Sequence, residues 1–151
     1  MYSNGQAVNS HNNIPPTDHI SRLCYGKSIG DGNILGAAFL PRPGDDYLSV
    51  NWLEYLRCPD QLSQVAEVRR RYANKFRSIK KKDRIAILNV EATCLKVQNE
   101  TDDNRCLRAT HEPEPEDDSH SGLWEFSYDD IIIGELILQS VTNDFPAVDT
   151  P

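Results

Sequence analysis

Residues 60–90 have the sequence DQLSQVAEVRRRYANKFRSIKKKDRIAILNV, which contains the two clearest secondary-structure signals of the chain. In its first half apolar residues recur every three or four positions, the spacing of one face of an amphipathic helix. These residues are Leu62, Val65, Val68, Tyr72 and Phe76. Asp60 directly follows Pro59 and is a predicted N-cap. After a turn-like Lys-Lys-Asp, residues 84–90 predict a buried strand, so helix and strand occur side by side in the sequence.

Four further segments predict strands. They have short apolar or β-branched stretches bounded by glycine, proline or charged residues. They are residues 19–25, 34–40, 47–50 and 121–126. Residues 91–97, EATCLKV, continue the strand at 84–90 or turn helical, and periodicity alone does not separate the two.

Two capping patterns predict additional helices. Asn51 followed by Glu54 resembles the start of a brief helix, WLEYL. Ser127 and Asp130 form a capping box ahead of IIIGELILQSV, a run so apolar that we expect a well-buried helix.

These elements mix without a regular βαβ alternation, so the predicted class is α+β, with α/β as the alternative. We expect one compact domain over residues 18–148, with a small mixed sheet and two or three helices. Residues 1–17 carry Asn, Ser, Gly and a Pro-Pro pair with almost no apolar content. Such a segment cannot offset its ordering entropy by burial, and a disordered tail is predicted.

Composition limits the function classes. The 151 residues are 38% hydrophobic and 26% charged, which is typical of a soluble protein. No apolar run approaches the roughly 20 residues of a membrane-spanning helix. The first residues lack the pattern of a secretory or transit peptide, so a cytoplasmic location and no membrane partner are expected. The widely spaced Cys24, Cys58, Cys94 and Cys106 are expected to be free thiols, and no metal site is predicted.

Charge is unevenly distributed along a chain whose net charge is −7. Half of its basic residues lie between positions 69 and 82, whereas acidic residues cluster at 112–118 and 129–130. The basic residues are Arg69, Arg70, Arg71, Lys75, Arg77, Lys80, Lys81 and Lys82. This segment predicts contact with an acidic protein or with phosphates, including nucleic acid. The alternative is a solvated helix face and loop.

A set of polar residues could bind a pyridine dinucleotide. Arg22 could hold the pyrophosphate, Tyr47 or Ser49 could position the ribose, and Glu54 could stabilise a developing oxocarbenium ion. Each residue also has an explanation without function, such as solvent exposure for Ser49 and a helix-start position for Glu54.

Histidines and the acidic loop offer weaker candidates. His19 and His120 could transfer protons near neutral pH or serve as surface residues. The loop HEPEPEDDSH at 111–120 could bind a divalent cation, but flexible ligands are costly to order and a solvated loop is the simpler interpretation.

Two resemblances add to these observations. The landmarks HISRLC, DGNILGAAF, YLSVN and EPEDDSHSGL, followed by an apolar helix and FPA, resemble a group of small uncharacterised bacterial proteins. That resemblance implies one domain and a bacterial origin. Residues 20–57 more faintly resemble the RES-type toxins of the ADP-ribosyltransferase-like superfamily, which consume NAD. This second resemblance implies an NAD pocket lined by Arg22, Tyr47, Ser49 and Glu54. The family's Gly-Gly-Arg-Trp stretch is replaced here by Ala37-Ala38-Phe39-Leu40.

Two functional hypotheses follow. The leading one is a small bacterial cytoplasmic accessory protein, without a cofactor, that binds a protein partner through charged elements. Its contact residues are Arg69, Arg70, Lys80, Lys81, Lys82 and His120. The alternative is an enzyme that consumes NAD as its substrate through Arg22, Tyr47 or Ser49, and Glu54.

Overall fold

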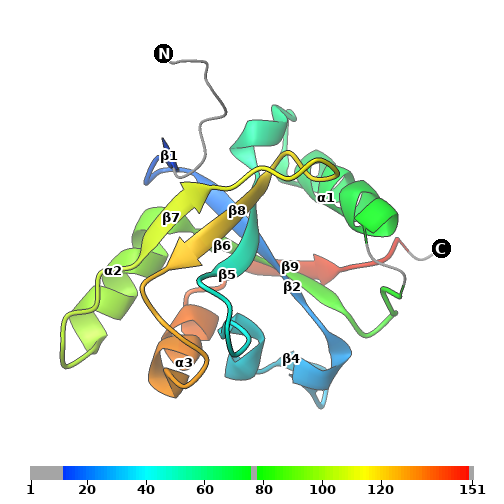
Figure 1. Cartoon of the computed structure of the whole chain (residues 1–151). Coiled ribbons are helices and arrows are strands. Elements are labelled where there is room, and N and C mark those ends of the chain that lie inside the picture. The colour runs from blue at the N-terminus through cyan, green and yellow to red at the C-terminus, as the bar shows by residue number, and fades with distance from the viewer. Residues whose placement is uncertain (1–11, 76–77, 150–151) are drawn as a thin grey trace.

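The computed structural model describes residues 12–75 and 78–149, and an antiparallel sheet of seven strands lies at its centre (Figure 1). The strand order is β1-β7-β8-β5-β2-β6-β9. The strands are β1 (Asn12–Asn13), β2 (His19–Cys24), β5 (Leu48–Trp52), β6 (Arg84–Asn89), β7 (Arg108–His111), β8 (His120–Trp124) and β9 (Asn143–Pro146). A separate hairpin pairs β3 (Ile29–Gly30) with β4 (Asn33–Ile34).

Three α-helices flank this sheet. They are α1 (Gln61–Lys75), α2 (Val90–Glu100) and α3 (Ile131–Gln139). Three short 3-10 helices lie in the connections: η1 (Gly26–Ser28), η2 (Gly36–Phe39) and η3 (Glu54–Leu56). The predicted α+β class is therefore confirmed, as is the number of helices. The sheet is larger than predicted, and every strand pair in it is antiparallel rather than mixed.

The helices divide between the two faces of the sheet. One core contains side chains from α2, α3 and η2, and a second core contains side chains from α1. Successive strand residues point to opposite faces. In β2, Ile20 and Cys24 accordingly join the first core, whereas Leu23 joins the second. We call the two sides the α3 face and the α1 face.

Helix α1 forms as its sequence predicts. The Asp60 carboxylate accepts a hydrogen bond from the Ser63 backbone N–H at 2.8 Å, which is the contact of an N-cap. Val65, Val68 and Tyr72 are buried against the sheet, and Leu62 is exposed at the first turn. Phe76, the last apolar residue of the predicted stripe, lies outside the described residues.

The strand predicted at 34–40 has a different structure. Of these residues only Ile34 belongs to a strand, β4. Gly36–Phe39 form η2, which packs against α3. The approach is close because both elements carry glycine there: a Cβ on Gly134 would lie 2.8 Å from the Gly36 carbonyl oxygen. A continuous apolar run indicates burial without indicating which backbone conformation is buried.

Both predicted capping patterns are altered. Asn51 lies inside β5 and is buried, so it caps nothing, and only the 3-10 helix η3 follows. Before α3, Asp130 itself is the N-cap residue, and its carboxylate accepts the Ser127 backbone N–H at 2.8 Å. The spacing therefore identified the contact between Ser127 and Asp130 but not which of the two is the N-cap, and Asn51 and Glu54 bond to other residues.

The fold also begins earlier than position 18. Asn12 and Asn13 pair with β7, and the side chain of Ile14 is buried in the core of the α3 face. The predicted tail therefore contains the edge strand of the sheet.

Among the residues that the structure describes, no helix is long and apolar enough to cross a membrane. The four cysteines are free thiols. Burial raises the pKa of Cys24 to about 12 and that of Cys94 to about 11.

Candidate functional site

Arg22 serves as a link between backbone segments. Its Nε donates to the Ala38 carbonyl at 2.8 Å, and its Nη1 donates to the Ser49 carbonyl at 3.0 Å. The ladder between β2 and β5 contains only two residue pairs, so the Arg22 guanidinium supplies a donor to a β5 carbonyl beyond that ladder. Burial lowers the pKa of the Arg22 guanidinium. Arginine side chains nevertheless stay protonated in proteins at neutral pH.

Glu54 has a different neighbour, on the other side of the sheet. Its Oε1 accepts the His19 backbone N–H at 2.7 Å, and its Oε2 lies 2.6 Å from His19 Nδ1. His19 is three residues before Arg22 in β2 and therefore points to the α1 face, whereas Arg22 points to the α3 face. The pair of Arg22 and Glu54 is thus separated by the sheet.

Tyr47 and Ser49 are also apart from Glu54. The ring of Tyr47 packs against Trp124, with centroids 4.8 Å apart, and lies 6.0 Å from His120. Burial and nearby acidic residues raise the pKa of Tyr47. Ser49 is exposed, and β5 places Tyr47 about 16 Å from Trp52 at its far end. The four residues of the NAD hypothesis do not converge on one cleft.

The acidic loop, by contrast, has a defined place. Asp117 is buried, and its two carboxylate oxygens each accept a hydrogen bond of 2.9 Å from Asn51 Nδ2. Ser119 Oγ donates to the same carboxylate at 3.1 Å, and Lys75 Nζ lies 3.5 Å away. A residue predicted to be solvated is therefore enclosed between β5 and α1.

Further ion pairs join this loop to α1. Arg71 contacts Asp118 at 2.9 Å, and Lys75 pairs with Glu114. His120 Nδ1 lies 2.8 Å from the Glu112 carbonyl oxygen, so this predicted binding residue is buried beneath the loop. The acidic and basic segments, which the sequence placed about 40 positions apart, in part neutralise one another.

Five basic residues stay on the surface or at its margin. Arg70 is 67% exposed beside Glu67, and Arg69 Nε donates to the Pro146 carbonyl at 2.9 Å. Lys80, Lys81 and Lys82 are exposed. We call Arg69, Arg70, Lys80, Lys81 and Lys82 the basic face. Arg77, which the sequence prediction included, lies outside the described residues.

A buried carboxylate holds the lysine turn in place. Asp83 is only 2% exposed, and it accepts the backbone N–H of Gly26 at 2.7 Å and that of Lys80 at 2.8 Å. These bonds tie the turn to the segment after β2. The three lysines are therefore presented by a fixed backbone.

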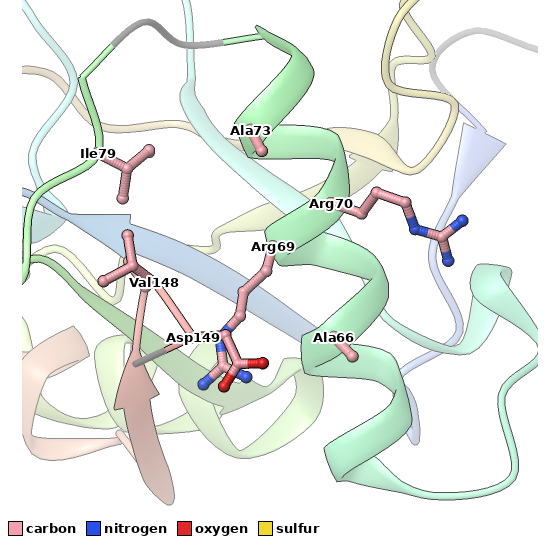
Figure 2. Close-up of a pocket in the computed structure, with 8 residues that line it drawn as sticks. Ala66, Arg69, Arg70, Ala73, Ile79, Val148 and Asp149 are labelled. Carbon is pink, nitrogen blue, oxygen red and sulfur yellow. The ribbon is translucent and has the colours of Figure 1, made fainter. Parts of the chain in front are cut away.

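A pocket of about 520 Å³ opens between α1 and the segment that follows β9 (Figure 2). Its lining combines small apolar side chains with charges: Ala66, Arg69, Arg70, Ala73, Ile79, Ala147, Val148 and Asp149. In Figure 2, Arg69 extends from α1 toward the C-terminal segment, whereas Arg70 points away from it. Both arginines are evident in the sequence as charges, but the pocket is not, because its alanines and C-terminal residues follow no recognisable pattern.

Within residues 12–75 and 78–149, no group of three or more His, Cys, Asp and Glu side chains is arranged to hold a metal ion. The resemblances described from the sequence stay predictions. No protein-family model, curated protein or solved structure matches the chain.

Proposed function

We propose that the protein is an accessory binding module that holds an acidic segment of a partner protein against the basic face and its pocket. One observation carries the proposal: Arg71 and Lys75 pair with acidic residues of the 111–120 loop, whereas Arg69 and Arg70 line a pocket that is partly apolar. Lys80, Lys81 and Lys82 are exposed in the turn that follows Ile79, another residue of the lining. The resemblance carried by the sequence landmarks adds a bacterial origin to this proposal, and the composition adds a cytoplasmic location.

The surface chemistry favours a particular kind of segment. Exposed charges act over about 10 Å at ordinary salt, so the local cations can attract an acidic group although the whole chain is acidic. Ala66, Ala73 and Ile79 leave room between the charges for an apolar side chain. The preferred segment therefore carries Asp or Glu beside at least one apolar residue.

Strand addition is not the proposed binding mode, because the outer edge of β9 is occupied. Its Pro146 has no N–H, and the Pro146 carbonyl accepts from Arg69. The Asp144 N–H donates to Asn143 Oδ1 at 2.9 Å, and the Asp144 carbonyl lies 3.5 Å from Arg84 Nη2. Recognition would rely on side chains in the pocket rather than on a new strand.

Selection of peptides from a random display library on the purified full chain tests this function. Enriched peptides should combine acidic and apolar residues and should bind more weakly as salt increases. An Arg69→Ala, Arg70→Ala double variant should raise the Kd of a selected peptide about tenfold, which corresponds to roughly 1.4 kcal/mol.

The matched control is Arg42→Ala, which removes another exposed arginine outside the pocket lining. Peptides without acidic residues, or equal loss of binding in both variants, would overturn the proposal. A fluorescein-labelled oligonucleotide that binds more tightly than the best peptide would assign the basic face to nucleic acid instead.

A further inference from the structure

Three aromatic rings gather where β5 ends and η3 begins. The ring centroids of Trp52 and Tyr55 are 5.6 Å apart, and those of Tyr55 and His111 are 4.7 Å apart. Trp52 meets His111 edge to face at 5.2 Å. Trp52 Nε1 also donates to Asp18 at 2.9 Å, which fixes the indole at the rim of the sheet.

A second pocket, of about 400 Å³, opens beside these rings. Trp52, Tyr55, Glu54, Arg57 and Asp118 line it. Its volume lies within the range of about 300–1,000 Å³ that is usual for small-molecule sites. None of these residues belongs to the basic face, so the pocket has no part in the function proposed above.

The two carboxylates of this pocket are already engaged. Both oxygens of Glu54 accept from His19, one from its backbone and one from its ring. Asp118 Oδ1 accepts from Arg71 Nε at 3.0 Å and also contacts Arg71 Nη2. These contacts reduce the attraction of either carboxylate for a cationic ligand.

Arg57 is the positively charged residue of the lining. No described residue makes a hydrogen bond or ion pair with its side chain, which is exposed. Its φ of 56° lies in the left-handed region, where non-glycine residues are uncommon. This conformation closes η3 through the Arg57 N–H to Glu54 carbonyl bond and holds the arginine at the pocket.

We propose that this pocket binds a planar ring compound that carries an anionic group. The ring lies against Trp52 and Tyr55, and the anionic group pairs with Arg57. Aromatic side chains favour planar ligands through stacking, and a guanidinium binds a phosphate or a carboxylate through two parallel hydrogen bonds.

Isothermal titration of the full chain tests the assignment with four probes. AMP carries a ring and a phosphate, 1-naphthoate carries a ring and a carboxylate, adenosine lacks the charge, and tryptamine carries the opposite charge. At least one anionic ring compound should bind saturably, and adenosine and tryptamine should bind at least about tenfold more weakly. The relative affinity of AMP and 1-naphthoate identifies which anionic group is preferred.

Arg57→Asn is the decisive variant, because asparagine tolerates the left-handed backbone and removes the charge. It should raise the Kd of the anionic probe about tenfold and leave the circular dichroism spectrum unchanged. Arg42→Asn is the matched surface control and should bind like the original chain.

Tighter binding of tryptamine, absence of saturable binding by both anionic probes, or unchanged affinity in Arg57→Asn would each overturn the proposal. Binding of acidic peptides to the basic face should be unaltered by Arg57→Asn, so the two proposals succeed or fail separately.

Discussion

The two faces of the sheet are held by different kinds of contact. Among the described residues, eighteen buried side chains form the core of the α3 face, and eight form that of the α1 face. On the α1 face a polar network completes the packing: Tyr72 Oη donates to Asn51 at 2.8 Å, and Asn51 donates to the buried Asp117. The α3 face therefore rests mainly on apolar packing, whereas the α1 face combines a smaller apolar core with buried hydrogen bonds.

The polar network lies on the α1 face, where α1 is the α-helix that packs against the sheet in the described part of the chain. α1 packs over the strands next to β9, and the loop between β7 and β8 reaches it from the other side (Figure 1). Burial raises the pKa of the Tyr72 hydroxyl, so it stays protonated and can donate to Asn51. The loop and α1 are therefore expected to lose stability together.

Removal of Asp117 should produce the largest change. Asp117→Ala removes the carboxylate that accepts hydrogen bonds from Asn51 Nδ2 and Ser119 Oγ and that lies 3.5 Å from Lys75 Nζ, and each hydrogen bond to a charged group contributes about 1.5–3 kcal/mol. Urea unfolding followed by circular dichroism measures the loss. Because Asp117 attaches the 112–118 loop to β5 and α1, proteolysis of this loop should accelerate in the same variant.

Glu116→Ala is the control for that experiment. Glu116 is exposed in the same loop, and its replacement should change the free energy of unfolding by less than about 0.5 kcal/mol. Equal effects of the two substitutions would mean that the loop carboxylates act only through net charge, and the proposed difference between the faces would be lost.

On the α3 face, stability should depend on close packing rather than on charge. Gly134→Ala places a methyl group 2.8 Å from the Gly36 carbonyl and 3.0 Å from Leu40 Cδ2. Overpacking of this kind costs about 1–3 kcal/mol, from which the better helix propensity of alanine recovers up to about 1 kcal/mol. The change should appear as a lower urea midpoint at both low and high salt.

Gly36→Ala provides the matched substitution across the same contact. The atoms nearest to its new methyl group would all belong to the exposed Glu135 side chain, which can move aside. We therefore expect a smaller loss than in Gly134→Ala. A reversed order would show that η2, rather than α3, limits the approach of the two elements.

The sequence predicted best the elements whose pattern is local. The stripe of Val65, Val68 and Tyr72 requires only helical spacing and a partner surface, and α1 follows it. Residues 34–40 failed because their conformation depends on two glycines that lie almost 100 positions apart and meet only in the fold. Long-range contacts of this kind leave no periodic signal.

The candidate sites were predictable in part for the same reason. Arg69 and Arg70 were evident as charges, but Ala66 and Ala73 give a pocket only because Ala147 is folded opposite them. Asp117 shares its sequence context with the exposed Glu116, and nothing local distinguishes the buried carboxylate from the solvated one. Arg57 was not recognised, since its left-handed backbone has no sequence marker at an arginine.

Arg22 links η2 to β5 and should have an intermediate effect. Arg22→Met removes the donors to the Ala38 and Ser49 carbonyls, and a buried acceptor without a partner costs about 1–3 kcal/mol. Because Arg22 is partly exposed, water should reduce the loss to the lower part of that range. Urea unfolding of Arg22→Met and of the exposed control Arg42→Met measures the difference. Unchanged stability in Arg22→Met would contradict the structural role and would return Arg22 to the residues available for ligand binding.

Between pH 8 and 10, alkaline pH should produce the smallest and most gradual change, through Cys24 on the α3 face. Burial raises the folded-state pKa of this thiol from 9.0 to about 12, so the folded protein holds the proton that the unfolded chain releases. The corresponding stability is complete below pH 9 and is lost as the pH rises from 9 toward 12, by at most about 1.4 kcal/mol for each pH unit. Urea unfolding at pH 8, 9 and 10 should therefore show a smaller pH dependence in Cys24→Ala than in the original chain. Cys106→Ala removes an exposed thiol and should retain the original dependence. If Cys24→Ala and the original chain lose stability in parallel, titration of groups such as Tyr72 on the α1 face accounts for the alkaline loss, and the apolar face is insensitive to pH.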